Sequence, residues 1–103
     1  MLKNTRRLFV LTRKDIKRSS PAVQAGHAVA TFQIEHPRAW ENEYLIFLQV
    51  KDLKELNRWK TIIDKKYPEA LISEFHEPDL NNELTAIAIS DINPKTFMSL
   101  RLL

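Results

Sequence analysis

The sequence predicts a three-layer α/β/α sandwich built on a mixed sheet of about four strands. Short apolar, strand-like runs alternate with longer helix-like segments, and the last two apolar runs are separated only by a turn. The chain has 103 residues, of which 44% are hydrophobic and 28% charged, an ordinary balance for one globular domain spanning residues 1–103. The expected order of elements is therefore β-α-β-α-β-β, followed by a short C-terminal helix.

Four apolar runs predict the strands. Residues 8–12 are continuously apolar, which is typical of a strand covered on both faces, and residues 44–50 form a second run of this kind. Residues 70–75 are less apolar and are expected nearer an edge of the sheet. Residues 84–89 form the fourth strand, and the Pro, Asp and Asn content of residues 77–82 predicts a turn before it. This short connection favours antiparallel pairing of the last two strands.

Two α-helices are expected between the strands. The first covers residues 22–35, because a serine N-cap candidate and Pro21 precede it and Pro37 ends it. The Asn-Pro pair at residues 93–94 predicts the start of the short C-terminal helix. The second α-helix covers residues 52–67, where apolar side chains recur at helical spacing: Leu53, Leu56, Trp59, Ile62, Ile63 and Tyr67.

Two residue counts exclude whole classes of site. There is no cysteine, which excludes disulfide scaffolds, thiol catalysis, zinc ribbons and iron–sulfur clusters. Gly26 is the only glycine, whereas the Walker loop, the G-x-G-x-x-G turn and the G-x-S-x-G elbow each need two or more. A glycine inside a helix costs about 1 kcal/mol relative to alanine, so we expect a strand or a second subunit to approach Gly26 closely.

Charge and hydropathy indicate the setting of the protein. No apolar stretch approaches the roughly 18 residues that span a bilayer, and the N-terminus lacks the form of a secretory signal, so a cytoplasmic protein without a membrane partner is expected. The net charge is +3, but residues 1–18 carry far more basic than acidic side chains, which favours an anionic partner at this end. Solvated charges flanking a strand are the alternative. The basic side chains are Lys3, Arg6, Arg7, Arg13, Lys14, Lys17 and Arg18.

The first expected helix carries a polar pair. Gln24 and His27 are three residues apart, so they share a helix face one turn from the N-terminus. Burying either group without partners is costly, which makes both candidates for a functional role. A satisfied core histidine together with a surface glutamine is the alternative interpretation.

The turn after the third expected strand carries the candidate carboxylates Glu77 and Asp79. Residues 77–83 superficially resemble a calcium loop, but the glycine and the glutamate that an EF-hand requires are missing. The histidines show no zinc-hydrolase spacing, so no metal is expected, and incidental carboxylates in a tight connection are the alternative. Sites in open sheets form beyond the carboxyl ends of the strands, so residues 13–20, the start of the first helix and this turn are expected to converge.

Three segments carry a resemblance to a known family. Residues 13–16, Arg-Lys-Asp-Ile, follow an R-x-D-L pattern, residues 22–28 have the form A-x-Q-x-x-H-A, and residues 85–89 match T-x-x-A-I. With these segments the chain resembles the peptidyl-tRNA hydrolases of the archaeal and eukaryotic type, known as the second type, over about residues 8–89. Residues 75–86 look like a small prokaryotic or phage-borne branch of that family.

The resemblance implies an esterase that hydrolyses the ester bond of peptidyl-tRNA or of a related acylated tRNA, without a cofactor and as a homodimer. It implies that His27 and Gln24 position water or substrate. It implies that Glu77 or Asp79 orients a proton acceptor or a cation, and that the hydroxyl of Thr85 lies at the edge of the site. The expected partner, tRNA or peptidyl-tRNA, would contact four cations through its phosphates: Arg13, Lys14, Lys17 and Arg18.

One departure from the family pattern favours a different function. Family members usually carry a lysine in the first turn of the motif helix, where residues 19–21 of this chain read Ser-Ser-Pro. In a second hypothesis the chain is therefore a catalytically impaired member that binds RNA or another protein. A third alternative is an unrelated small α/β regulatory protein, which the absence of a mixed sheet would support.

Overall fold

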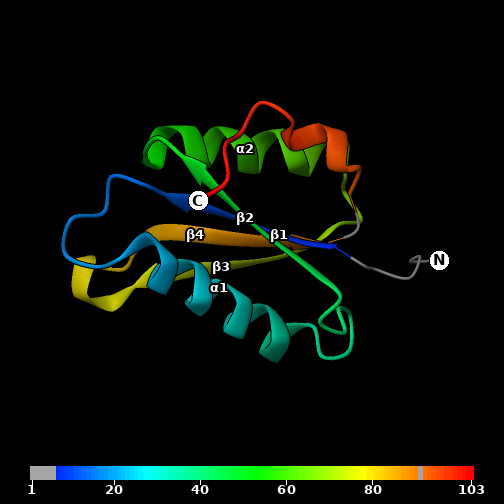
Figure 1. Cartoon of the computed structure of the whole chain (residues 1–103), viewed down its shortest axis with the longest axis horizontal. Coiled ribbons are helices and arrows are strands. Elements are labelled where there is room, and N and C mark those ends of the chain that lie inside the picture. Colours follow the sequence, from blue (N-terminus) through cyan, green and yellow to red (C-terminus); the bar gives the residue numbers. More distant parts are fainter. Residues whose placement is uncertain (1–6, 91) are drawn as a thin grey trace.

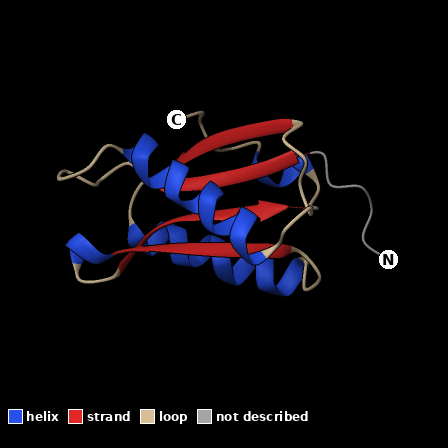
Figure 2. Ribbon diagram, turned by 90° about the horizontal axis from the view of Figure 1, so that it is seen from below, coloured by secondary structure: helices blue, strands red, loops and turns tan. Residues whose placement is uncertain are grey.

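The computed structural model describes residues 7–90 and 92–103, and within them the elements follow the predicted order (Figure 1). Helix α2 covers one face of the sheet and helix α1 the other, so the predicted α/β/α sandwich is confirmed (Figures 1 and 2). The expected C-terminal helix is a short 3-10 turn, η2. The elements are β1 (Arg7–Arg13), α1 (Pro21–Glu35), β2 (Tyr44–Val50), α2 (Leu53–Lys66), β3 (Leu71–Glu77), η1 (Pro78–Leu80), β4 (Glu83–Ser90) and η2 (Pro94–Phe97).

The strand order is β2-β1-β4-β3, in which β1 and β2 are parallel and β4 runs antiparallel to both of its neighbours. The carboxyl ends of β1, β2 and β3 therefore lie at the same edge as the start of β4. The loop over residues 14–20, the start of α1 and η1 gather at this edge, on the left of Figure 1. We call it the carboxyl edge of the sheet, and the predicted convergence of these segments is confirmed.

The position of β2 differs from the prediction. In the order β2-β1-β4-β3, β2 is the strand at one edge of the sheet. Its first two residues, Tyr44 and Leu45, are 52% and 43% exposed. The expectation that this whole run is buried is therefore wrong for its first half. The C-terminal segment pairs with the second half, where the Leu103 N–H donates to the Phe47 carbonyl at 2.9 Å. The third strand lies at the opposite edge, as its weaker hydropathy predicts.

Both helices begin at caps that are readable in the sequence. The Ser20 Oγ accepts a hydrogen bond from the Ala22 N–H at 3.2 Å, and Pro21 is the first residue of α1. The Asp52 carboxylate accepts one from the Glu55 N–H at 2.9 Å at the start of α2. These side chains satisfy N–H groups that a helix leaves unpaired at its first turn. Among the described residues, no helix is both long and apolar enough to cross a membrane.

Gly26 does not lie where the sequence analysis expects it. The residue is on the exposed side of α1, and a Cβ atom built on it would meet nothing within 4 Å. The expected close approach of a strand is therefore wrong, because Ala25 and Ala28 occupy the face of α1 that packs on the sheet. The approach of a second subunit stays a prediction.

Candidate active site

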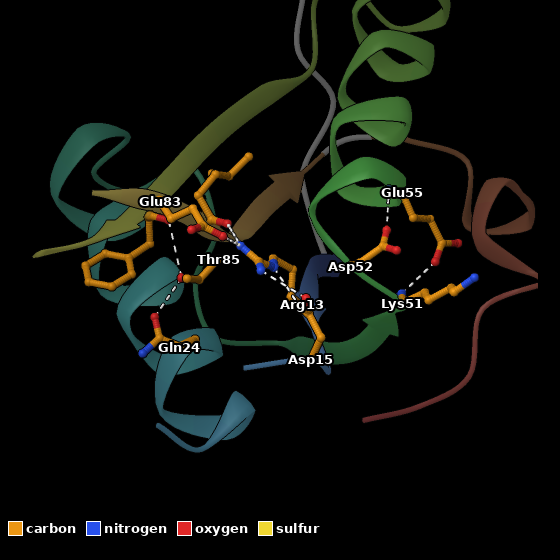
Figure 3. Close-up of polar contacts among 10 residues, drawn as sticks. Arg13, Asp15, Gln24, Lys51, Asp52, Glu55, Glu83 and Thr85 are labelled. Carbon is orange, nitrogen blue, oxygen red and sulfur yellow. Dashed lines mark hydrogen bonds and ion pairs between the residues drawn. The ribbon is translucent and has the colours of Figure 1, made fainter. Parts of the chain in front are cut away.

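A buried amide is the centre of a hydrogen-bonded network at the carboxyl edge. Gln24, on α1, is fully buried, and its Nε2 donates to the Ser19 Oγ at 3.0 Å and to the Glu77 Oε1 at 2.9 Å. Its Oε1 accepts from the Thr85 Oγ1 at 2.6 Å, the bond drawn in Figure 3. A carboxylate can only accept hydrogen bonds, so Glu77 determines which end of the amide is the nitrogen. The network therefore holds Gln24 in one orientation.

A β-bulge brings Thr85 into this network. The register of β3 and β4 shifts between Phe75 and His76, which leaves Thr85 without a partner residue on β3. Strict alternation would place Thr85 on the same face as Ile87, which packs on the α2 side. The bulge turns its hydroxyl to the α1 side instead, where Gln24 accepts its proton.

Glu77 is the carboxylate that joins the network. It ends β3 and caps η1, where its Oε2 accepts from the Asp79 N–H at 3.3 Å. The hydrogen bond from Gln24 lowers the pKa of Glu77 below its usual range, with smaller contributions from the Asp79 N–H and the nearby charge of His27. Glu77 is therefore ionised at neutral pH. Asp79, the other predicted carboxylate, is exposed and contributes only its backbone N–H.

His27 lies on the solvent side of α1, and its charge is one of the smaller causes of the lowered pKa of Glu77. Its ring stacks on Phe75 with the centroids 4.4 Å apart and the planes at 13°. The side chain is exposed, whereas Gln24 is fully buried. The alternative of a core histidine with a surface glutamine is therefore wrong for both residues. The stacking leaves an oriented, accessible imidazole one turn along α1.

Arg13 is not an exposed cation. It is 7% exposed, and its Nε and Nη2 donate to the two carboxylate oxygens of Asp15 at 2.9 and 3.0 Å. Its Nη1 donates to Glu83 and to the Leu84 carbonyl (Figure 3). The hydrogen bond with Asp15 raises the pKa of Arg13 and lowers that of Asp15. The expectation that Arg13 contacts phosphate does not agree with this placement, because the buried guanidinium is already paired with two partly exposed carboxylates, those of Asp15 and Glu83.

The other predicted cations are placed differently. Lys14, Lys17 and Arg18 are exposed on the loop that leads from β1 to α1, so they are accessible to a partner. Lys3 and Arg6 lie outside the described residues.

Sequence reasoning missed two parts of this site. Ser19 was not among the expected site residues, but its Oγ accepts from the Gln24 Nε2, and among residues 7–90 and 92–103 nothing accepts its hydroxyl proton. Its position in the loop just before α1 was the available signal. The ion pair of Arg13 was the second part missed: its pairing with Asp15 joins near neighbours along the chain, whereas the participation of Glu83 depends on the pairing of β1 with β4.

The described part of the chain contains no group of three or more His, Asp or Glu side chains able to hold a metal ion. In comparisons with known proteins, no family model and no curated protein matches this chain.

Proposed function

We propose that the protein hydrolyses the ester bond of peptidyl-tRNA or of a related acylated tRNA. One observation supports this most: the buried Gln24 amide holds the ionised Glu77 at the end of β3, and the accessible imidazole of His27, one turn further along α1, stacks on Phe75, two residues before Glu77. The arrangement suits water activation, since ester hydrolysis needs an oriented water and a proton acceptor. The resemblance of residues 22–28 to the A-x-Q-x-x-H-A motif supplies the substrate class.

In the proposed reaction Glu77 and His27 hold one water molecule between them. Glu77 has a lowered pKa and is therefore a weak base, so it orients the water by accepting one of its hydrogens. The imidazole of His27 takes the other proton as the water oxygen attacks the acyl carbonyl carbon, because histidine is the side chain best suited to proton transfer near neutral pH.

The tetrahedral intermediate then collapses. The bond between the acyl carbon and the ribose oxygen breaks, and the protonated imidazole of His27 returns its proton to that oxygen. The Ser19 hydroxyl keeps a hydrogen that it can donate to the developing oxyanion. Thr85 acts as a positioning residue, since its hydrogen bond orients Gln24 rather than the substrate.

A single-turnover assay tests the proposal. We expect purified protein in excess to release the acyl group from peptidyl-tRNA, and His27→Asn to slow release by about 10²-fold or more, the usual scale for a positioned acid–base group. His36→Asn is the matched control. His36 lies at the C-terminal end of α1, and its ring also contacts a phenylalanine, with the centroids of His36 and Phe32 4.9 Å apart. Binding of peptidyl-tRNA without release by the wild type would instead support the RNA-binding alternative.

A further inference from the structure

A cationic surface lies beside the candidate site at the same edge of the sheet. Two adjoining hollows, of about 330 and 180 Å³, lie where α2 begins and where the C-terminal segment crosses the ends of β1 and β2. Both are lined by Lys51 and Glu55. We call them together the cationic hollow, after its basic lining residues: Lys14, Lys51, Lys54, Arg58 and Arg101.

The cations of the hollow form no ion pair with any acidic side chain that the structure describes. Within residues 7–90 and 92–103, the ion pairs involve other basic side chains: Arg13, Lys60 and His76. The two carboxylates in the lining bind backbone instead, as Figure 3 shows. Asp52 accepts from the Glu55 N–H at 2.9 Å, and Glu55 accepts from the Lys51 N–H at 2.6 Å. The lining therefore has five basic side chains against two acidic ones, an excess of positive charge that no ion pair among the described residues neutralises.

Two cations of the hollow, Lys51 and Lys54, lie where the dipole of α2 is unfavourable for a positive charge. The N-terminus of a helix is its positive end, where acidic side chains are favourable and basic ones unfavourable. Lys51 precedes the N-cap of α2 and Lys54 lies in its first turn, yet both are basic. Lys65 and Lys66, at the other end of α2, lie where the helix dipole favours cations. The carboxylates of Asp52 and Glu55 offset this charge in part, and a bound anion would offset the rest of the basic lining.

We propose that the cationic hollow binds backbone phosphates of the RNA whose acylated end lies at Gln24 and Glu77. This inference rests on the proposed function. In Figure 3, Gln24 lies on one side of Arg13 and Lys51 on the other. Lys14, which follows Arg13 directly, lines the hollow. Each hollow has room for several water molecules at about 30 Å³ each, and so for a hydrated phosphate. Phosphate contacts of this kind set the register of a nucleic acid without reading its sequence.

Binding of fluorescently labelled, deacylated tRNA tests the inference. In the double variant Lys54→Gln and Arg58→Gln we expect at least tenfold weaker binding at low salt. The slope of log affinity against log salt concentration should fall by about 2, roughly one for each lost phosphate contact. The matched control is Lys65→Gln with Lys66→Gln, which removes the same charge from the other end of α2 and should change affinity less than twofold. Equal losses in the two double variants would overturn the inference.

Competition identifies the source of the anion. We expect unlabelled tRNA to displace the labelled tRNA, and millimolar inorganic phosphate to leave it bound. Displacement by inorganic phosphate alone would overturn the RNA assignment in favour of a small phosphorylated ligand. Displacement by polyglutamate as effective as that by tRNA would overturn it in favour of an acidic protein.

The acyl-release assay separates this inference from the proposed function. At subsaturating protein, the Lys54→Gln and Arg58→Gln variant should release the acyl group more slowly than the wild type, in proportion to its weaker binding. The control variant Lys65→Gln with Lys66→Gln should release it at the wild-type rate, because neither residue lies in the cationic hollow or in the candidate active site. If the wild type binds tRNA through these cations but releases no acyl group, the hydrolysis proposal fails and the inference stands. If release occurs while the variant keeps full affinity and salt slope, the inference fails and the hydrolysis proposal stands.

Discussion

The two faces of the sheet are covered by helices that pack in different ways. On the α2 side the core consists mainly of large side chains: Phe9, Leu11, Leu48, Val50, Leu56, Trp59, Ile63, Leu84, Ile87, Ile89 and Phe97. On the α1 side half of the core residues are alanines: Leu8, Val10, Ala25, Ala28, Phe32, Trp40, Ala86 and Ala88. Small side chains let a helix lie close to a sheet. The α1 face can therefore carry a polar network that reaches from helix to strand.

The two sides of the sheet contribute differently to the stability of the fold and to the candidate site. Large apolar side chains on the α2 side remove the most surface from water, so this side should contribute most of the stability. On the α1 side, the short distance from α1 to β4 lets the Gln24 amide reach the Thr85 hydroxyl at 2.6 Å. A larger residue at Ala86 or Ala88 would separate these groups. The α1 side therefore buries smaller apolar side chains, which allows the hydrogen bonds of the candidate site to form.

The largest effect is expected from a substitution on the α2 side. Ile63 is fully buried, and Ile63→Ala should lower the free energy of unfolding by about 2–5 kcal/mol through lost burial and a cavity. Urea denaturation measures this, and acyl release by the folded variant should remain near the wild-type rate. Ile34→Ala is the matched control, because Ile34 lies on α1 and is 79% exposed; it should change stability by less than about 0.5 kcal/mol. Equal effects at the two isoleucines would refute the comparison.

Two buried threonines on the sheet test whether the polar network on the α1 side depends on one specific hydroxyl. Thr85 donates to Gln24, whereas no described residue pairs with the Thr12 hydroxyl, although both side chains are fully buried. Thr85→Val leaves the buried Gln24 oxygen unpaired, so it should cost about 1–3 kcal/mol and slow acyl release. Thr12→Val removes an unpaired hydroxyl and should leave stability unchanged or higher. Thermal unfolding and the release assay on both variants measure this, and a larger loss for Thr12→Val would contradict the assigned network.

The smallest effect is a dependence on pH that belongs to the α1 side. The folded-state pKa of Glu77 lies below its ordinary value of 4.5, so its contribution to stability is present above that value. This contribution is lost as the pH falls through the lower, folded-state pKa. Glu77→Gln keeps an acceptor for Gln24 without a titrating charge, so it should narrow the difference in Tm between about pH 6 and pH 3.

Asp79→Asn provides the control for this measurement. Asp79 is an exposed carboxylate in the same turn whose side chain forms no bond with another described residue. Its substitution should leave the difference in Tm between the two pH values as in the wild type. If Asp79→Asn narrows that difference as much as Glu77→Gln does, the pH dependence does not arise from the bond between Gln24 and Glu77.

Local signals in the sequence were sufficient for the elements and for most of the site's location. The N-cap serine and Pro21 predicted the start of α1, and the apolar spacing of residues 52–67 predicted α2, because capping and amphipathicity depend only on near neighbours along the chain. The alternation of strands and helices predicted the sandwich, and hence the edge where Gln24 and Glu77 meet.

Only the tertiary structure decided which individual side chains are buried and toward which face of the sheet they point. The spacing of Gln24 and His27 places them on one side of α1, but the sheet determined that the first is buried and the second exposed. The bulge that turns Thr85 toward α1 arises from the pairing of β3 with β4, and the burial of Arg13 from contacts with Glu83 and Leu84, about seventy residues further along the chain. A sequence pattern shows the spacing at which apolar residues recur, and this spacing distinguishes a helix from a strand. Register and burial depend on distant strands that the pattern does not contain.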